Sequence, residues 1–322
     1  MNKLALRDEA FQARLSSFLQ KRALLCPEKL RFLKHAVFVL RDDSGQKYIL
    51  KGIKQRASVQ QQLDFQTVYP DSDIVRFVHF PNGEFFLYEY GYHWLLMPYR
   101  EGQSLQFANK QDRETAVEVL RNFHLAARGI KVADPVIRPP LVYKWENRLH
   151  RFSKTRFLFE AAGKDSLASE IIDTTASLLE RLRKDIDWYT MEKTAVDRRS
   201  WTHGDVASHN FLRTNSSAVN IIDFDLLSLA PESYDWIQLG QRFLPYVNHD
   251  IKQLCSSLFS EKEEEIDFIL RSVGTPVDLI REWLLFSRRK PSWNQLFDYV
   301  SHLEEKWKQR VKFVKDVEIV LT

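Results

Sequence analysis

The stretch Ser200–Leu229, SWTHGDVASHNFLRTNSSAVNIIDFDLLSL, decides the fold of this 322-residue chain. It holds two short polar clusters in an apolar frame. The first is HGD at 203–205 with Asn210 after it, and the second is IIDFD at 221–225. Apolar residues on both sides of a polar turn at 213–217 predict a loop, a short strand, a turn and a second short strand. We expect this hairpin to present the oxygen-bearing side chains of both clusters from one end.

Three oxygen-bearing side chains at one place suit a magnesium and phosphate site. Phosphoryl transfer needs a group that takes the proton of the attacking hydroxyl, and oxygen ligands for a cation that bridges the phosphates. Asp205 is the expected proton acceptor, and Asn210 and Asp223 are the expected Mg2+ ligands. An ordinary hairpin with aspartate caps remains the alternative, because Gly-Asp is common in turns. The combination of both clusters favours the catalytic interpretation.

The spacing of the first cluster is that of the kinase catalytic loop, in which four residues separate the aspartate from the asparagine. The chain resembles the aminoglycoside phosphotransferase and choline-kinase-like branch of the protein-kinase-like fold, which has HGD at this place. The second cluster stands where this family has its metal-binding aspartate, with Asp225 in place of a glycine. The segment PESYDW at 231–236 is similar to a further motif of the family, and we expect Asp235 to cap the helix that follows. The resemblance implies ATP as co-substrate, Mg2+ as cofactor, and His203 as a support of the catalytic loop.

The resemblance implies an α+β, bilobed, protein-kinase-like fold. Residues 1–99 would form a small β-rich lobe that covers the nucleotide, and residues 100–322 a larger, mostly helical lobe with the catalytic loop, metal site and acceptor helices. A chain of 322 residues is long enough for both. The residue pattern predicts strands at 31–40, 47–51, 74–80, 84–90 and 92–97. It predicts helices at 5–22, 57–69, 111–128, 145–159, 166–187, 236–244, 277–286 and 293–314.

Lys51 matches the family's phosphate-binding lysine, on the predicted strand before the first lobe's helix. A cation on a rigid strand would neutralise phosphate charge. A solvated lysine at a strand end is the alternative, and Lys54 is the second choice for the same role. Leu96, Met97 and Tyr99 are the expected hinge, whose backbone would bind adenine, although the bare residues fit a plain loop with Pro and Gly equally well.

Two features of the family's nucleotide site are missing from the sequence. The segment 27–44 has no glycine, whereas a loop that covers phosphates uses glycine so that backbone N–H groups can approach them. The helix predicted at 57–69 has no glutamate to pair with the lysine, and Gln61, Gln62 and Asp64 are its polar alternatives. Both absences put tight ATP binding in question, but not the fold.

Composition sets the remaining bounds. The net charge of +4 does not favour nucleic acid as a partner. Cys26 and Cys255 form neither a disulfide framework nor a zinc pattern. The N-terminus lacks the apolar core of a signal peptide, and no run is long enough to span a membrane, so we expect a cytoplasmic protein without a membrane partner.

Basic residues recur in the segments expected to shape the acceptor site. Residues 144–156 carry five lysines and arginines, for which a solvated helix face and recognition of an anionic partner are both open. The last predicted helices carry Arg281 and the run RRK at 288–290. Because a polycationic aminoglycoside would need an abundance of carboxylates here, we do not expect antibiotic resistance.

A finer resemblance rests on aromatic-rich segments and on FSRRKPSWNQLFDY at 286–299. These are most similar to bacterial spore-coat CotS-type kinase-like proteins, which implies deposition in the spore coat and coat proteins as partners. Two functions stay open. One is an ATP- and Mg2+-dependent phosphotransferase that acts on a hydroxyl acceptor of unknown identity. The other is a catalytically impaired scaffold of the coat, favoured by the missing glycines and glutamate.

Overall fold

The computed structural model describes residues 8–71, 73–259 and 265–321 and divides the chain into two compact units. Unit 1 combines Met1–Leu105, Val119–Val136 and His209–Ser228. Unit 2 combines Gln106–Glu118, Ile137–Ser208 and Leu229–Thr322. Because these units are groupings by contact, whereas the expected lobes are contiguous stretches, the lobe boundary near residue 99 stays a prediction.

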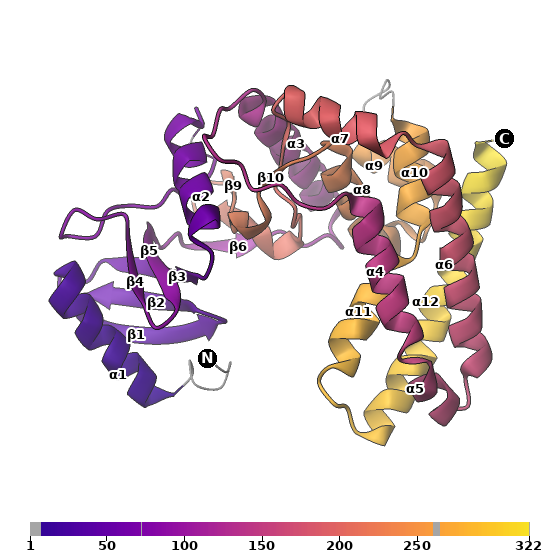
Figure 1. Ribbon diagram of the computed structural model, residues 1–322, viewed down its shortest axis with the longest axis horizontal. Coiled ribbons are helices and arrows are strands. Elements are labelled where there is room, and N and C mark those ends of the chain that lie inside the picture. Colours follow the sequence, from indigo (N-terminus) through magenta and orange to yellow (C-terminus); the bar gives the residue numbers. More distant parts are fainter. Residues whose placement is uncertain (1–7, 72, 260–264, 322) are drawn as a thin grey trace. The chain divides into compact units, whose positions relative to one another are not determined.

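An antiparallel sheet of five strands forms the body of unit 1 (Figure 1). In the spatial order β1-β2-β3-β5-β4, its strands are β1 (Pro27–Lys34), β2 (Val37–Asp42), β3 (Lys47–Ile53), β5 (Tyr92–Pro98) and β4 (Phe86–Glu89). A two-residue turn at His35 and Ala36 joins β1 to β2, and Ala36 has a positive φ of 50°. The prediction of one strand over 31–40 is therefore wrong. Tight hairpin turns use positive φ, so this β-prone stretch folds back on itself.

The segment 74–80 forms no named strand, so the prediction of a strand there is wrong. Ile74 and Val78 each make one isolated bridge. The amide of Phe77 donates instead to the side-chain oxygen of Gln66, at 2.9 Å. Strand propensity describes a fit to a pleated sheet, and here a helix side chain satisfies the backbone in place of a ladder.

Helices make up most of the rest of the described chain. They are α1 (Glu9–Phe18), α2 (Arg56–Val68), α3 (Lys110–Ala127), α4 (Leu141–Ser153), α5 (Arg156–Ala161), α6 (Asp165–Asp185), α7 (Trp188–Asp197), α8 (Ser233–Phe243), α9 (Ile251–Leu258), α10 (Ile266–Gly274), α11 (Val277–Ser287) and α12 (Trp293–Val320). Of the helix predicted over 5–22, residues 5–7 lie outside the described chain, and α1 is followed by a π-helical turn at Leu19–Ala23. Within the described ranges, no helix combines the length and the apolar character that crossing a membrane requires.

A second sheet contains the hairpin predicted within Ser200–Leu229. Its strands are β6 (Gly102–Ser104), β8 (Phe211–Thr214) and β9 (Val219–Ile221), in the order β6-β8-β9. β8 and β9 pair antiparallel across the polar turn, so the predicted strand, turn and strand are confirmed. The small antiparallel sheet and the many helices also confirm the α+β class.

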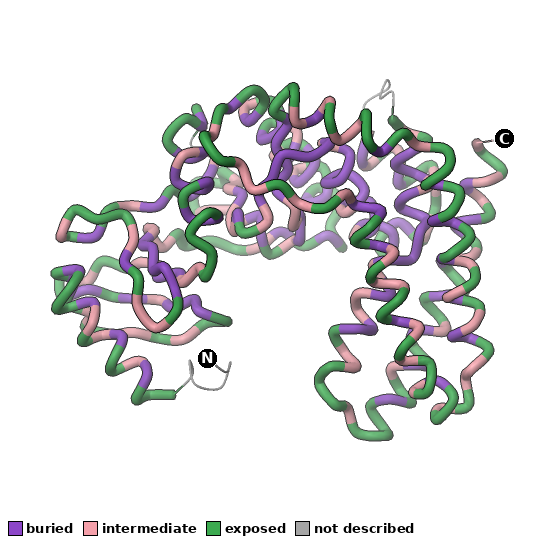
Figure 2. The backbone as a smooth tube through the Cα atoms, viewed as in Figure 1, coloured by how far each residue is buried: buried purple, intermediate pink, exposed green. Residues whose placement is uncertain are grey.

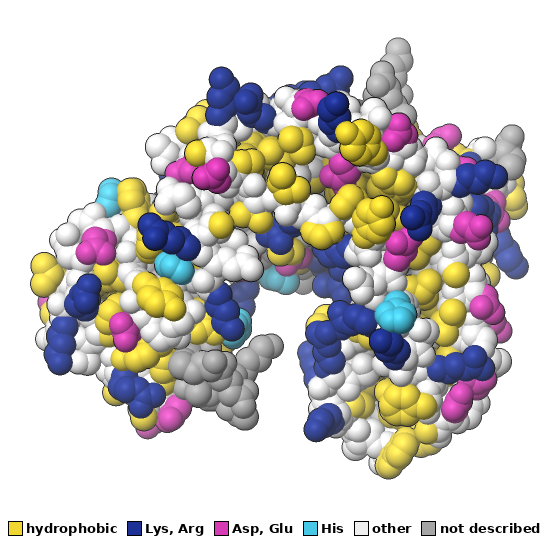
Figure 3. Space-filling view, in the orientation of Figure 1, with side chains coloured by type: hydrophobic (Ala, Val, Ile, Leu, Met, Phe, Trp, Pro, Cys, Tyr) yellow, Lys and Arg dark blue, Asp and Glu magenta, His cyan; other side chains and the backbone are white. Residues whose placement is uncertain are grey.

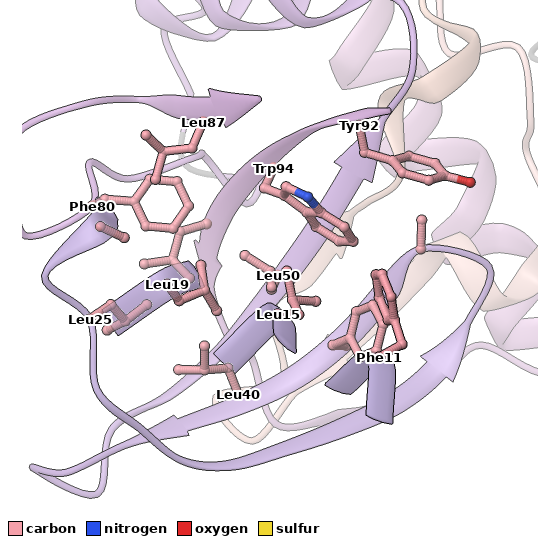
Figure 4. Packing of buried hydrophobic residues seen from close by; sticks show 14 residues of the cluster. Phe11, Leu15, Leu19, Leu25, Leu40, Leu50, Phe80, Leu87, Tyr92 and Trp94 are labelled. Atoms are coloured by element: carbon pink, nitrogen blue, oxygen red, sulfur yellow. The ribbon is translucent and has the colours of Figure 1, made fainter. Parts of the chain in front are cut away.

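Successive side chains of a strand point to opposite faces of a sheet. Each face of the first sheet is covered by one helix. Leu50 of β3 and Trp94 of β5 lie in one core with Phe11 of α1 (Figure 4). Leu95 of β5 lies in a second cluster with Val59 of α2. Each fully buried side chain of this kind stabilises the fold by about 1.5–3 kcal/mol. The packing on both faces holds β3 in place, and with it Lys51, the residue after Leu50.

The core of unit 2 is built around Trp283 of α11, which has no exposed surface. Its ring centroid lies 4.3 Å from that of Phe159 in α5, and its Nε1 donates to Thr155 Oγ1 at 2.8 Å. Thr155 Oγ1 in turn donates to the carbonyl of Phe152, and the helix is interrupted between α4 and α5. The single helix predicted over 145–159 is therefore wrong. Figure 2 shows buried residues along α4, α6, α11 and α12, several of which belong to this core.

Candidate active site

Lys51 is buried in unit 1 and contacts both carboxylates of the IIDFD cluster. Its side chain is 7% exposed, and its Nζ lies 2.7 Å from Asp223 Oδ1 and 2.8 Å from Asp225 Oδ1. Lys51 is therefore not a solvated lysine at a strand end. Lys54, the second choice, is exposed and lies with its Nζ 5.5 Å from the centre of the Tyr92 ring. Of the two lysines, only Lys51 reaches the predicted metal-binding aspartate.

The neighbouring carboxylates keep Lys51 charged. Burial alone lowers the pKa of Lys51, but Asp223 and Asp225 outweigh burial, and the pKa of Lys51 ends above its ordinary value. Burial also acts to raise the pKa of Asp223, yet Lys51 and Lys34 together hold that pKa well below its usual range. The pair is thus a charged ammonium and a charged carboxylate at neutral pH.

Lys34 is a member of the site that the sequence interpretation missed. It is the last residue of β1, and its Nζ lies 2.9 Å from Asp223 Oδ2, so each oxygen of Asp223 contacts a different lysine. The family would place a glycine-containing loop at the turn beside it. An ammonium can also meet phosphate charge, so this chain supplies a cation where backbone N–H groups were expected. No local sequence signal pointed to Lys34, because 189 positions separate it from Asp223.

Asp223 has a backbone conformation that is uncommon for a residue with a side chain. Its φ is 71° and its ψ is 64°, in the left-handed region, where strain is often stored at functional sites. The preceding amide, that of Ile222, donates to the carbonyl of Asn210 at 2.9 Å. The backbone therefore ties the segments of Asn210 and Asp223 together at the end of the hairpin. Asp205 belongs to unit 2, so its place beside these two residues stays a prediction.

The residues at this place fit a Mg2+ ion. A carboxylate and an amide offer the oxygen atoms that Mg2+ prefers, and this ion usually takes its other ligands from water and substrate phosphates. Among the described residues, no group of three or more His, Cys, Asp or Glu side chains could hold a metal by itself. A site built from Asn210 and Asp223 would therefore depend on a bound phosphate compound to complete its ligand set.

The helix that lacks a glutamate uses Gln61 for a different purpose. This buried side chain donates from Nε2 to the carbonyl of Leu227 at 2.8 Å, and its Oε1 accepts from the amide of Val136. Gln61 therefore links three segments of unit 1. Asp225, which replaces the family's glycine, supplies the second carboxylate beside Lys51.

Of the expected hinge residues, Leu96 and Met97 lie near the end of β5 and Tyr99 follows it. The carbonyl of Leu96 accepts from the amide of Val78 at 2.8 Å, and the amide of Tyr99 donates to the carbonyl of Lys47 at 3.1 Å. Leu96 is buried, while Met97 and Tyr99 are partly exposed. A role for these three residues in binding adenine stays a prediction.

In unit 2, the HGD turn follows β7 (Trp201–Thr202) and is held by Asp235. The buried carboxylate of Asp235 accepts from the amide of His203 at 2.7 Å and from that of Gly204 at 2.9 Å. Gly204 has a φ of 79°, a conformation that other residues rarely adopt. Because α8 begins at Ser233, the prediction of Asp235 as a helix cap is wrong: it lies in the first turn and supports the loop.

Asp205 has a partner that the sequence did not reveal. Arg242 of α8 donates from Nη2 to Asp205 Oδ1 at 2.7 Å. The pKa of Arg242 is lowered, chiefly by burial, and Asp205 works against this shift. The buried ring of His203 adds a further contact, since its Nδ1 accepts from the amide of Asp205 at 3.3 Å. The carboxylate of Asp205 is thus oriented from α8, and its backbone from His203.

Comparisons with solved structures agree with this fold. An aminoglycoside phosphotransferase from Alicyclobacillus acidocaldarius matches with a TM-score of 0.67 and 17% identity, over 91% of this chain and 92% of the other. A spectinomycin phosphotransferase in complex with ADP and spectinomycin matches with a TM-score of 0.62 and 16% identity, over 96% and 97% of the two chains. A choline kinase from Streptococcus pneumoniae matches with a TM-score of 0.54 and 12% identity, over 92% and 100%. No curated protein matches the sequence.

The α+β architecture, and the contacts of Lys51 with Asp223 and Asp225, define a kinase-like fold. The model of the phosphotransferase enzyme family matches residues 33–246, well over half of the chain. The chain therefore belongs to this family, and the resemblance to aminoglycoside phosphotransferases and choline kinases is confirmed at the level of family and fold.

Proposed function

We propose that the protein transfers the γ-phosphoryl group of ATP to a hydroxyl group of a second substrate. The observation that carries this proposal is the contact between Lys51 and Asp223 at 2.7 Å, on a hairpin whose backbone also ties in Asn210. Similar folds have been solved with ADP or AMP bound, which supports a nucleotide as co-substrate. We further propose the cytoplasm as the place of synthesis, with no nucleic acid or membrane partner.

Each residue has a chemical role in this reaction. Lys51 and Lys34 would neutralise phosphate charge, and the hinge at Leu96, Met97 and Tyr99 would bind the base. Asn210 and Asp223 would hold Mg2+, which when bound offsets the charge that develops on the phosphates. Positioning and charge stabilisation are the main demands of phosphoryl transfer, and these groups meet both.

Asp205 would accept the proton of the attacking hydroxyl. The acceptor oxygen forms a bond to the γ-phosphorus, the bond from that phosphorus to the β–γ bridging oxygen breaks, and ADP leaves. Arg242 would hold the Asp205 carboxylate in position, and the buried His203 would hold its backbone. His203 and Arg242 are therefore positioning residues in this proposal.

Turnover of ATP in the absence of an acceptor tests the assignment of Asp205. Kinases of this kind can pass the phosphoryl group slowly to water, so release of ADP can be followed without knowing the acceptor. We expect Asp205→Asn to lower this rate at least about 100-fold, in the range of general-base effects. Asp250→Asn makes the same chemical change at the exposed N-cap of α9 and should leave the rate unchanged. Equal rates in wild type and Asp205→Asn would contradict the role of Asp205.

A second candidate is a catalytically impaired scaffold of the bacterial spore coat. Two observations favour it: both oxygens of Asp223 contact lysines, and Gln61 is engaged in structural hydrogen bonds where a kinase has a glutamate. Coat proteins would then be its partners. Fractionation of purified spores, followed by detection of the protein in the coat layer, tests the location. A protein found in the coat that also releases ADP would be a coat-associated phosphotransferase, and this result would contradict catalytic impairment.

A further inference from the structure

Three cations of unit 2 lie near one another. Lys144 and Arg148 are one turn apart on α4, and Arg281 lies on α11, which packs against α4. Lys144 is exposed, and partial desolvation together with Arg148, Arg138 and Arg281 lowers its pKa. Burial and Arg281 lower the pKa of Arg148 to about 10. Residues four apart on a helix are neighbours, and α11 packs against α4, so these like charges repel each other. Figure 3 shows Lys and Arg side chains gathered over α4 and α11.

The carboxylates nearby are neutralised by other cations. Arg310 binds Asp278 through two contacts of 2.7 Å, and Lys306 lies 3.1 Å from Glu282. Glu146, on α4 itself, is 3.3 Å from Arg183.

The three cations themselves have no such partner. Within the described parts of the chain, Lys144, Arg148 and Arg281 have no carboxylate within 4.0 Å and no side-chain hydrogen bond. Unpaired cations that repel each other destabilise a protein, and an anion bound among them would remove that cost.

The cation cluster, defined as Lys144, Arg148 and Arg281, lies on the same unit as the proposed base. The negative charge of Asp205 acts to raise the pKa of Lys144, so the two groups are within electrostatic range. Arg281 in turn acts to lower the pKa of Arg242, the residue that holds Asp205. The cluster and Asp205 thus belong to the same unit, within electrostatic range of each other.

We propose that the acceptor carries an anionic group, a phosphate or a carboxylate, and that Lys144, Arg148 and Arg281 bind it beside the hydroxyl that Asp205 deprotonates. This inference rests on the proposed function. Arginine forks and a lysine ammonium both form charge-assisted hydrogen bonds with such groups. A cationic acceptor would place like charges together and be rejected.

Binding of inorganic phosphate, measured by calorimetry without nucleotide, tests the cation cluster directly. We expect Lys144→Gln and Arg281→Gln each to weaken binding at least about tenfold, the loss of one charge-assisted hydrogen bond. Lys252→Gln removes the same charge from an exposed position on α9, and Lys51→Gln removes the phosphate-binding lysine of unit 1; both should still bind phosphate in unit 2. Arg281→Lys keeps the charge and should retain most of the affinity. No binding by the wild type, or equal binding by all variants, would overturn the inference.

Turnover with matched alcohols tests the same inference independently. Glycerol 3-phosphate and glycerate should stimulate release of ADP more than glycerol, and choline should not stimulate it. In Lys144→Gln, the KM for the anionic alcohol should rise about tenfold with little change in kcat, as expected for lost substrate binding. Preference for choline or glycerol would overturn the inference but not the proposed function. Phosphate binding without any turnover would overturn the proposed function and leave the anion site in place.

Discussion

The ammonium of Lys51 and the carboxylate of Asp223 lie 2.7 Å apart, although 172 positions separate the two residues in the chain. Lys51 is supplied by the centre of one sheet and Asp223 by the end of a hairpin in another. A buried charge is tolerated only when it is paired, so each residue depends on the other for its ionised state. This pair joins the stability of unit 1 to its proposed chemistry.

Replacing Lys51 by alanine should therefore affect both properties. The substitution removes two ion pairs and leaves Asp223 with Lys34 alone, so we expect the free energy of unfolding to fall by about 3 kcal/mol. Release of ADP should fall below detection. Chemical denaturation and the turnover assay measure the two effects. Lys29→Ala, an exposed lysine on β1, should change neither; a Lys51→Ala protein of wild-type stability would show that the pair contributes nothing to the fold.

Gln61→Glu should not improve the enzyme, although it restores the family's usual residue. The Nε2 of Gln61 donates to the carbonyl of Leu227, and a glutamate would place an acceptor against that carbonyl. We expect a loss of about 1–3 kcal/mol in the free energy of unfolding, the cost of a buried polar group without its partner. Thermal unfolding measures it. A more active and equally stable variant would contradict this structural role of Gln61.

Asp235→Asn should lower kcat while nucleotide binding is retained. The carboxylate accepts from the amides of both His203 and Gly204, and an asparagine can present one oxygen and one NH2 group instead of two oxygens. The HGD turn should lose part of its support, with a decrease in kcat of about tenfold, equivalent to one lost hydrogen bond. Calorimetry with ATP and the turnover assay separate the two effects. If ATP binding falls and turnover of bound ATP does not, Asp235 has a different role.

His249 should make the protein less stable in acid. Burial and the nearby Arg310 lower its pKa to about 4 in the folded state, against an ordinary value near 6.5, while Asp278 works in the opposite direction. Between these values the unfolded chain binds more protons, so the free energy of unfolding falls as the pH falls from about 6.5 to 4. Denaturation at several pH values should show a flatter profile for His249→Gln in this window. Parallel profiles would indicate that His249 does not contribute.

The local parts of this account could be predicted from the sequence, because their signals are local. Neighbouring residues alone determine three of these features: the alternating strand that ends near Lys51, the hairpin after Asn210 and the glycine of the HGD turn. Lys34 and Arg242 could not be found in this way. Lys34 meets Asp223 across 189 positions and Arg242 meets Asp205 across 37, and no periodicity describes such contacts.

The errors have the same origin. The stretch predicted as one strand at 31–40 forms a hairpin. The sequence did not indicate its turn, because His35 and Ala36 stand where a tight turn usually has a glycine. The segment 74–80 has the composition of a strand, but the side chain of Gln66 takes its backbone bond. Gln61 stands where the family has a glutamate, and no local pattern describes its two long-range hydrogen bonds. Tertiary contacts decided each of these cases.

Binding of ATP, measured by calorimetry with and without Mg2+, tests the central claim most directly. The proposed site predicts that the wild type binds ATP more tightly with Mg2+, and that Asp223→Ala abolishes this dependence. Asp43→Ala, in an exposed turn of the same unit, should bind as the wild type does. A folded wild-type protein that does not bind ATP at millimolar concentration would contradict the phosphotransferase function and leave the scaffold as the remaining candidate.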